Sequence, residues 1–355
     1  MQLKAKITKL TQWEHWPTFM YYLPLVPYYL YQSVKNKSFT FFLLTNPAIR
    51  YSGNGTESKY KTIQLVPKKY RPKSILLNAP TPLKIVLEKL KNEGILFPLI
   101  AKPDLGFRGL LVKKINSENA LKTYLHKNNS IAIILQEFIS FPKECGIFYY
   151  RLPNEKTGKI TSITLKKFLT VVGDGKATLS ELILADSRAF LYYDLFKKIH
   201  VNNMNTIIDL NKKITLSVIG NHSKGTEFLN GNHLITQELE KTFDVLSTKI
   251  NGWFFGRLDI KYQTFEELLK GENFKILEIN GIIAEPTHIY DATAKNASYF
   301  AALKEIKKNW EVITKIAKTN KQQLGLENPK LLPYIKELAF LRRYTKEIKK
   351  LNKQD

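Results

Sequence analysis

Two short segments of the sequence alternate polar and apolar residues in the manner of half-buried strands. They read Gly256-Arg257-Leu258-Asp259-Ile260 and Ile276-Leu277-Glu278-Ile279-Asn280. Side chains two residues apart on a strand point to the same face, so Arg257 should lie beside Asp259 and Glu278 beside Asn280. If the two strands pair, all four polar groups converge.

The chemistry of these four groups suits phosphoryl transfer. Asp259, Glu278 and Asn280 offer hard oxygen atoms of the kind that Mg²⁺ takes, with phosphate oxygens completing its shell. Arg257 could stabilise the negative charge that develops on a transferring phosphoryl group. The alternative is a pair of amphipathic strands whose charges face solvent.

A lysine at the end of an apolar run marks a second candidate site. Residues 97–109 read Phe-Pro-Leu-Ile-Ala-Lys-Pro-Asp-Leu-Gly-Phe-Arg-Gly. Lys102 could reach nucleotide phosphates, and backbone N–H groups of the turn around Gly106 and Gly109 could cradle them. The alternative is an ordinary surface turn.

A third candidate is an apolar strand that ends in polar residues. It reads Ile134-Leu135-Gln136-Glu137-Phe138-Ile139, and Glu144 follows shortly after it. Backbone groups at such a strand end can pair with the edge of an adenine, and a carboxylate can accept hydrogen bonds from ribose hydroxyls.

Two glycine-containing turns complete the candidates. The segment Gly220-Asn221-His222-Ser223-Lys224-Gly225-Thr226 combines donors, a cation and glycines in one loop. His222 and Lys224 could bind an anionic substrate or cover a γ-phosphate, or the loop could be a plain polar turn. The segment Val171-Val172-Gly173-Asp174-Gly175-Lys176 is glycine-rich too, and an Asp-Gly hairpin turn explains it equally well.

Taken in order, the lysine turn, the Gln-Glu-Phe-Ile strand and the Arg-x-Asp and Leu-Glu-Ile-Asn strands resemble the ATP-grasp superfamily, over roughly residues 85–300. The order and spacing of these motifs are similar to those in D-alanine–D-alanine ligase and its relatives, and the glycine-rich turn at 171–176 resembles that of cyanophycin-synthetase-like ligases. The resemblance implies that Lys102 and Lys166 or Lys167 contact nucleotide phosphates, that Glu137 to Ile139 meet adenine and that Glu144 meets ribose. It further implies ATP and Mg²⁺ as cofactors, with Asp259, Glu278 and Asn280 as metal ligands.

The implied fold is α+β, with two subdomains that grip ATP. The sequence departs from D-alanine–D-alanine ligase after Asn280, where it reads Gly281-Ile-Ile-Ala-Glu-Pro-Thr-His-Ile-Tyr-Asp291 in place of a small-residue Pro-Gly loop. The acceptor pocket should therefore differ, and D-alanine is doubtful as the substrate.

We expect three regions: an aromatic-rich N-terminal region at 1–80, an ATP-grasp domain at 81–325 and a basic helical tail at 326–355. Hydrophobic periodicity and capping residues predict the elements. Strands are expected at 39–44, 95–101, 131–135, 146–151, 160–172, 256–262 and 274–279, and helices at 83–92, 117–127, 178–184, 186–200, 235–250, 264–270, 303–317 and 333–351.

The stretch Trp16 to Val34 holds no charged residue but contains three prolines, which argue against a membrane-spanning helix. Its five tyrosines, with Trp13 and Trp16, instead suit a wet–dry boundary, so contact with a lipid surface or with a partly apolar acceptor is an open alternative to burial against the core. The basic tail could add attraction to anionic lipid.

The charge and cysteine content exclude some classes of protein. The net charge is +24, yet the lysines spread along the whole chain and form no basic block with interleaved aromatics, which disfavours nucleic acid as a partner. The single cysteine, Cys145, excludes an internal disulfide framework and fits a reducing compartment. We expect a cytoplasmic protein, or one held peripherally at the inner membrane face.

The leading interpretation is a Mg²⁺-dependent ligase that joins a small carboxylate to an amine through an acyl phosphate. Arg257, Lys224 and His222 are its candidate catalytic residues. The alternatives are an ATP-grasp phosphotransferase that releases a phosphate ester, and a membrane-surface module without catalysis.

Overall fold

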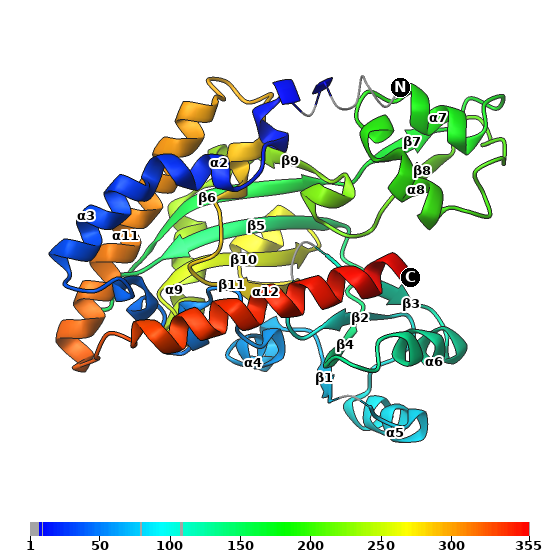
Figure 1. Cartoon of the computed structure of the whole chain (residues 1–355). Coiled ribbons are helices and arrows are strands. Elements are labelled where there is room, and N and C mark those ends of the chain that lie inside the picture. Colours follow the sequence, from blue (N-terminus) through cyan, green and yellow to red (C-terminus); the bar gives the residue numbers. More distant parts are fainter. Residues whose placement is uncertain (1–6, 9, 79, 107–108, 355) are drawn as a thin grey trace.

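A computed structural model describes residues 7–8, 10–78, 80–106 and 109–354 of the chain. Every pairing among the described strands of its three sheets is antiparallel. Antiparallel sheets with helices gathered outside them make an α+β fold, as the sequence predicted. The small and large sheets lie beside each other, and a third, two-stranded sheet belongs to a separate small unit (Figure 1).

The sheets use eleven strands among the described residues. The small sheet has the order β1-β4-β2-β3, with strands Ser74–Leu77, Ile133–Glu137, Leu99–Pro103 and Lys113–Ile115. The large sheet has the order β11-β10-β5-β6-β9, with strands Phe274–Asn280, Phe255–Tyr262, Lys143–Tyr150, Lys159–Lys167 and Glu227–Asn230. The third sheet pairs β7, Thr170–Val172, with β8, Lys213–Thr215.

Eleven α-helices surround these sheets in the described parts of the chain. They are α2 Phe19–Tyr22, α3 Val26–Lys35, α4 Lys59–Gln64, α5 Leu83–Glu93, α6 Glu118–Lys127, α7 Leu179–Ala185, α8 Tyr193–Ile199, α9 Gln237–Thr248, α10 Phe265–Leu269, α11 Tyr299–Leu324 and α12 Leu331–Gln354. Short 3₁₀ turns join several of them, notably η1 Trp13–His15, η2 Leu23–Leu25 and η3 Phe41–Leu44.

Capping residues fix several helix starts where the sequence predicted them. Ser117 accepts a hydrogen bond from the backbone of Ala120 at the start of α6. Thr178 and Glu181 form the reciprocal capping box of α7. Gly94, with a φ of 63°, ends α5 in the left-handed conformation that glycine adopts at little cost.

The large sheet is buried on both faces by separate cores. One face packs on α9 and α10 around Trp253 and Phe243, which are fully buried. The other face packs on α11 and on the four apolar residues of η3. These four residues were expected to form a strand, and that prediction is wrong. All four side chains are buried in one core, which a 3₁₀ turn permits and an alternating strand does not.

The small sheet has its own core with α5 and α6, and α12 joins it. Ile348 of α12 is buried there, whereas Tyr334 at the other end of the helix is buried in the core around α11. Figure 1 shows α12 running across the front of the molecule between these two regions. The basic tail therefore packs along the fold and connects its two larger parts.

Candidate active site

A cavity of about 860 Å³ lies between the two larger sheets. The small sheet contributes Lys102 and Gln136, and the large sheet contributes Glu144, Lys166, Asp259, Lys261 and Glu278. The segment 217–224 and α8 of the small unit close another side, and Asn352 of α12 reaches the rim. All three sequence motifs thus line one cavity.

The register of β10 and β11 brings the first motif together. Arg257 lies opposite Asn280, and Asp259 lies opposite Glu278. The expected convergence of these four side chains is confirmed. Their strands occupy the large-sheet wall of the cavity, where the carboxylates of Asp259 and Glu278 face the lysines of both sheets.

Asp259 is the most heavily bonded of the four groups. Its carboxylate accepts hydrogen bonds from Arg257 Nε and Nη2, both at 3.2 Å, and from Asn280 Nδ2 at 3.0 Å. Lys166 Nζ lies 3.1 Å from its Oδ1. Burial alone would raise the pKa of Asp259, but Arg257 and Lys166 hold this pKa far below its usual range. The carboxylate is therefore charged at every physiological pH.

Glu278 forms an ion pair with Lys59, a residue that the sequence reasoning missed. Lys59 begins α4, and Asp104 fixes that helix start by accepting hydrogen bonds from Ser58 Oγ and the Tyr60 N–H, both at 2.9 Å. Burial opposes the charge on Glu278, and the nearby ammonium groups of Lys59 and Lys102 lower its pKa below the usual value. No motif surrounds Lys59, so only the packing of α4 against β11 reveals it.

Lys102 points into the cavity from β2. Its ammonium donates to Gln136 Oε1 at 3.1 Å and to the Leu277 carbonyl at 3.4 Å. Burial lowers the pKa of Lys102 to about 8, although Glu278 raises it in part. Gln136 Nε2 is buried without a hydrogen-bond partner among the described residues. A buried donor at the wall of a cavity is free to bind a ligand.

Lys166, and not Lys167, faces the cavity. Lys166 Nζ lies 2.7 Å from Glu144 Oε1 and 3.1 Å from Asp259 Oδ1, and its side chain is buried. Burial would lower the pKa of Lys166, but the two carboxylates raise it above its usual value. Lys167 points outward to Glu227. The alternation of the strand thus selects between the two lysines that the sequence left open.

The predicted adenine hinge lines the end of the cavity near the small sheet. Phe138 lies between two further lysines that the sequence reasoning missed, with Lys114 Nζ 4.1 Å and Lys261 Nζ 5.5 Å from its ring centroid. Lys261 also donates to the Ile139 carbonyl at 3.2 Å. Glu137 turns back and accepts a hydrogen bond from the Lys73 N–H at 3.1 Å. Lys261 could have been found, because it follows Asp259 by two residues on β10.

The turn that contains Gly106 and Gly109 meets the loop at 219–224 at the cavity. Gly109 has a φ of 67°, and a side chain there would contact Ile219 and Lys224. Gly106 lies in the same turn, and Phe107 and Arg108 lie outside the described residues. Gly220 lies directly against the carboxylate of Glu144, so a side chain at this position would require that carboxylate to move. Lys224 lines the cavity, and burial lowers its pKa.

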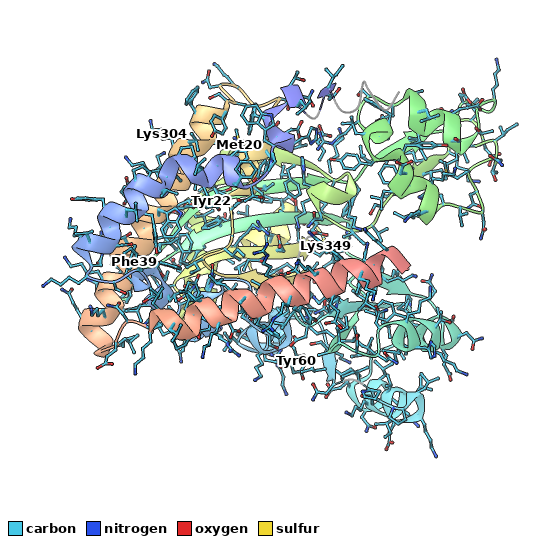
Figure 2. The ribbon with its side chains drawn as sticks, viewed as in Figure 1. Met20, Tyr22, Phe39, Tyr60, Lys304 and Lys349 are labelled. Carbon is cyan, nitrogen blue, oxygen red and sulfur yellow. The ribbon has the colours of Figure 1, made fainter. Side chains whose placement is uncertain are left out.

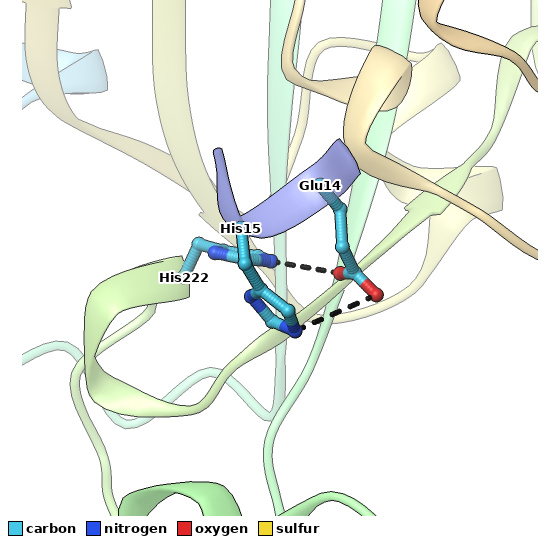
Figure 3. A group of neighbouring side chains, drawn as sticks. All are labelled: Glu14, His15 and His222. Atoms are coloured by element: carbon cyan, nitrogen blue, oxygen red, sulfur yellow. Dashed lines mark hydrogen bonds and ion pairs between the residues drawn. The ribbon is translucent and has the colours of Figure 1, made fainter. Parts of the chain in front are cut away.

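His222 takes a different position from Lys224. Its Nε2 lies 3.0 Å from Glu14 Oε2 and 3.0 Å from Arg188 Nη2, and His15 lies nearby (Figure 3). Glu14 and the two histidines could in principle hold a metal ion, but the guanidinium of Arg188 already neutralises the carboxylate at 3.2 Å. His222 is not part of the cavity lining. This cluster joins the N-terminal segment to the loop above the cavity.

No family model and no curated protein matches the chain. Similar solved structures include D-alanine–D-alanine ligase from Bacillus anthracis, at 14% identity and a TM-score of 0.44, covering 78% of this chain and 72% of that one. VanG D-Ala:D-Ser ligase from Enterococcus faecalis matches at 13% identity and a TM-score of 0.41, covering 76% and 63%.

A bifunctional glutathione synthetase from Pasteurella multocida matches at 12% identity and a TM-score of 0.37. That match covers 70% of this chain, which spans only 36% of the synthetase. The chain is thus structurally similar to ATP-grasp ligases. Identities this low leave the function to be argued from the site itself.

Proposed function

We propose that the protein is an ATP-dependent ligase that activates a small carboxylate as an acyl phosphate and joins it to an amine. The observation that carries this proposal is the convergence of Lys102, Lys166, Asp259 and Glu278 in one cavity between two sheets. Two cations suit the phosphate oxygens and two carboxylates suit a divalent ion, which is the arrangement that phosphoryl transfer uses.

The residues that line the cavity fit both ATP and Mg²⁺. Gln136 offers a buried N–H donor that lacks a partner among the described residues, which suits a nucleotide at the hinge. Asp259 and Glu278 offer carboxylate oxygens for a metal ion. The Nδ2 of Asn280 donates to Asp259, which leaves the Oδ1 of Asn280 for the same ion. The ammonium of Lys59 now occupies the place of a cation against Glu278.

Bound MgATP would supply the γ-phosphoryl group, which passes to a carboxylate oxygen of the substrate. In this proposal Lys102 and Lys166 hold the phosphates, and Arg257 stabilises the charge on the transferring group. The amine then attacks the acyl carbon, phosphate leaves and the amine loses a proton. Lys224 and its loop exclude water from the intermediate.

The acceptor side is bounded by the loop at 281–291, which differs from that of D-alanine–D-alanine ligase. Arg257 Nη1 donates to the Glu285 carbonyl at 3.1 Å, and the Glu285 carboxylate accepts from Tyr290 Oη at 2.6 Å. A carboxylate at this position supports an acceptor that carries an amino group. It also argues against a second anionic substrate there.

An ADP-release screen over amino acids, peptides and polyamines, in pairs and singly, would test the proposal. A ligase releases ADP and phosphate together when both the carboxylate and the amine are present. ADP release with a single substrate and without free phosphate would indicate a phosphotransferase. No ADP release across the screen, with no MgATP binding, would contradict both.

A further inference from the structure

The N-terminal helices carry an exposed apolar stripe that the proposed ligase function does not explain. Its members on α2, η2 and α3 are Phe19, Leu23, Val26, Leu30 and Val34. The spacing of four, three, four and four residues places them on one face of the helical segment. These side chains are between 41% and 75% exposed.

The opposite face of the same segment packs inward. Tyr21 of α2 is fully buried against Tyr290 and Tyr299, and Gln32 and Ser33 of α3 are also buried. Trp16 also packs inward on Tyr299. Tyr21 and Trp16 therefore belong to the inward face, whereas Tyr31 is 60% exposed. The aliphatic side chains, which a water-facing helix normally buries, point outward instead.

The charges around the stripe are mostly positive. The sequence has no acidic residue between Glu14 and Glu57, and Lys35 and Lys37 follow the stripe directly. From the neighbouring helix α11, Lys307 lies 5.7 Å from the ring centroid of Tyr28. Helix α2 contacts α11, and Figure 2 labels Met20 on α2 and Lys304 on α11.

Two acidic residues of α11 also belong to this surface. Glu305 and Glu311 form ion pairs with Lys308 and Lys307, respectively, at 2.7 Å and 3.8 Å. The cations Lys35, Lys37 and Lys304 remain, so the net charge at the border of the stripe is positive.

We propose that this stripe docks on the surface of an anionic lipid bilayer. The apolar side chains would enter the boundary between headgroups and acyl chains, and the lysines would contact anionic headgroups. Insertion across the bilayer is not involved: no described helix is long and apolar enough to cross a membrane, and Pro24 and Pro27 lie within the stripe. The proposal is independent of the ligase activity.

Co-sedimentation of the full chain with vesicles tests this docking. Phosphatidylcholine vesicles with and without phosphatidylglycerol would be compared, each at low and high salt. We expect binding to anionic vesicles that weakens with salt, and a fall of about tenfold in Leu23→Gln/Leu30→Gln. The matched control is Leu210→Gln/Val245→Gln, two exposed apolar side chains on other elements, which should bind like the wild type.

A labelling experiment keeps the proposal testable if the double variant is unstable. Cys145 is the only cysteine and is buried, so Val34→Cys can be labelled selectively with a polarity-sensitive dye. A blue shift with anionic vesicles supports docking. Absence of wild-type binding, equal binding by the double variant, equal binding to neutral vesicles, or a stripe-dependent dimer in place of vesicle binding would each overturn it.

Discussion

The candidate site is a set of closely packed opposite charges. Lys166 lies between Glu144 and Asp259, and Lys59 pairs with Glu278. Removing one partner of a buried pair usually costs more than the pair contributes, because the other charge stays behind. Variants at this site therefore need a folding control beside each activity measurement.

Glu278→Gln should abolish Mg²⁺-dependent turnover. The amide keeps the shape but removes a metal-binding charge, so ADP release should fall by about a hundredfold or more. Glu272→Gln, exposed on the hairpin between β10 and β11, is the control and should keep full activity. Thermal unfolding would show that both variants fold. Undiminished turnover in Glu278→Gln would remove this residue from the site.

Lys102→Ala should weaken nucleotide binding by roughly tenfold or more at pH 7. Burial lowers the pKa of the wild-type lysine to about 8, so it loses its proton as the pH rises through 8. Phosphate needs the charged form, and wild-type affinity should therefore fall from pH 7.5 to 9, by up to about tenfold per pH unit.

Titration of an ATP analogue by thermal shift would measure both effects of Lys102→Ala. The variant should show a flatter pH profile than the wild type, and Lys91→Ala on the exposed side of α5 should match the wild type. Equal stabilisation of wild type and Lys102→Ala by the analogue would count against phosphate contact by this residue.

At the scale of elements, α12 packs on the cores of both larger sheets. Arg50 pairs with Glu337 at 2.7 Å near its start, and Ser130 donates to Glu347 at 2.9 Å near its end. Asn352 Oδ1 accepts the Leu111 N–H at 3.1 Å. Leu111 has a φ of 57°, a conformation that leucine rarely adopts, so its neighbours must hold it. The tail thus supports the turn that contains Leu111 at the cavity.

Asn352→Ala should weaken nucleotide binding without lowering global stability much. The variant loses the hydrogen bond from the Leu111 N–H, which contributes about 1 kcal/mol. If this energy holds the turn in its binding conformation, nucleotide affinity should fall roughly fivefold. Lys353→Ala, on the adjacent exposed position, is the control. Calorimetric titration with an ATP analogue would measure the difference. Identical affinities for the two variants would show that α12 does not influence the turn.

At the scale of the whole molecule, the N-terminal segment connects distant parts of the chain. Glu14 of η1 bonds His222 in the loop at 219–224, while Tyr21 of α2 packs on Tyr290 in the loop at 281–291. The N-terminal segment that includes the exposed stripe is therefore in direct contact with both loops. Docking on lipid would place the acceptor side near the membrane surface.

Glu14→Gln should destabilise the fold near neutral pH more than in acid. Burial opposes the charge, but His222 and Arg188 lower the pKa of Glu14 from 4.5 to about 2. A lowered carboxyl pKa adds stability above pH 4.5, at most about 3 kcal/mol, and this stability disappears as the pH falls toward 2. Urea unfolding at pH 7 and pH 3 would measure the difference between wild type and variant.

The control for this measurement is Glu93→Gln, an exposed carboxylate at the end of α5, which should leave stability nearly unchanged. A constant difference between wild type and Glu14→Gln across the pH range would indicate lost packing in place of a lost ion pair.

The sequence by itself determined the elements and the chemistry of the first motif. The alternation at 256–260 and 276–280 placed Arg257, Asp259, Glu278 and Asn280 on one side of paired strands, because side-chain direction along a strand has a period of two. The sequence also predicted the helix starts at Ser117 and Thr178 and the helix end at Gly94. Each of these depends only on residues within one helical turn.

Only the tertiary structure decided what depends on contacts between distant residues. It chose Lys166 over Lys167, added Lys59 from α4 and turned His222 toward Glu14. It also changed residues 41–44 from a strand to a 3₁₀ turn and pointed aliphatic side chains of α3 outward. Periodicity reports which residues share a face, but which face meets the core is set by the free energy of packing the whole chain.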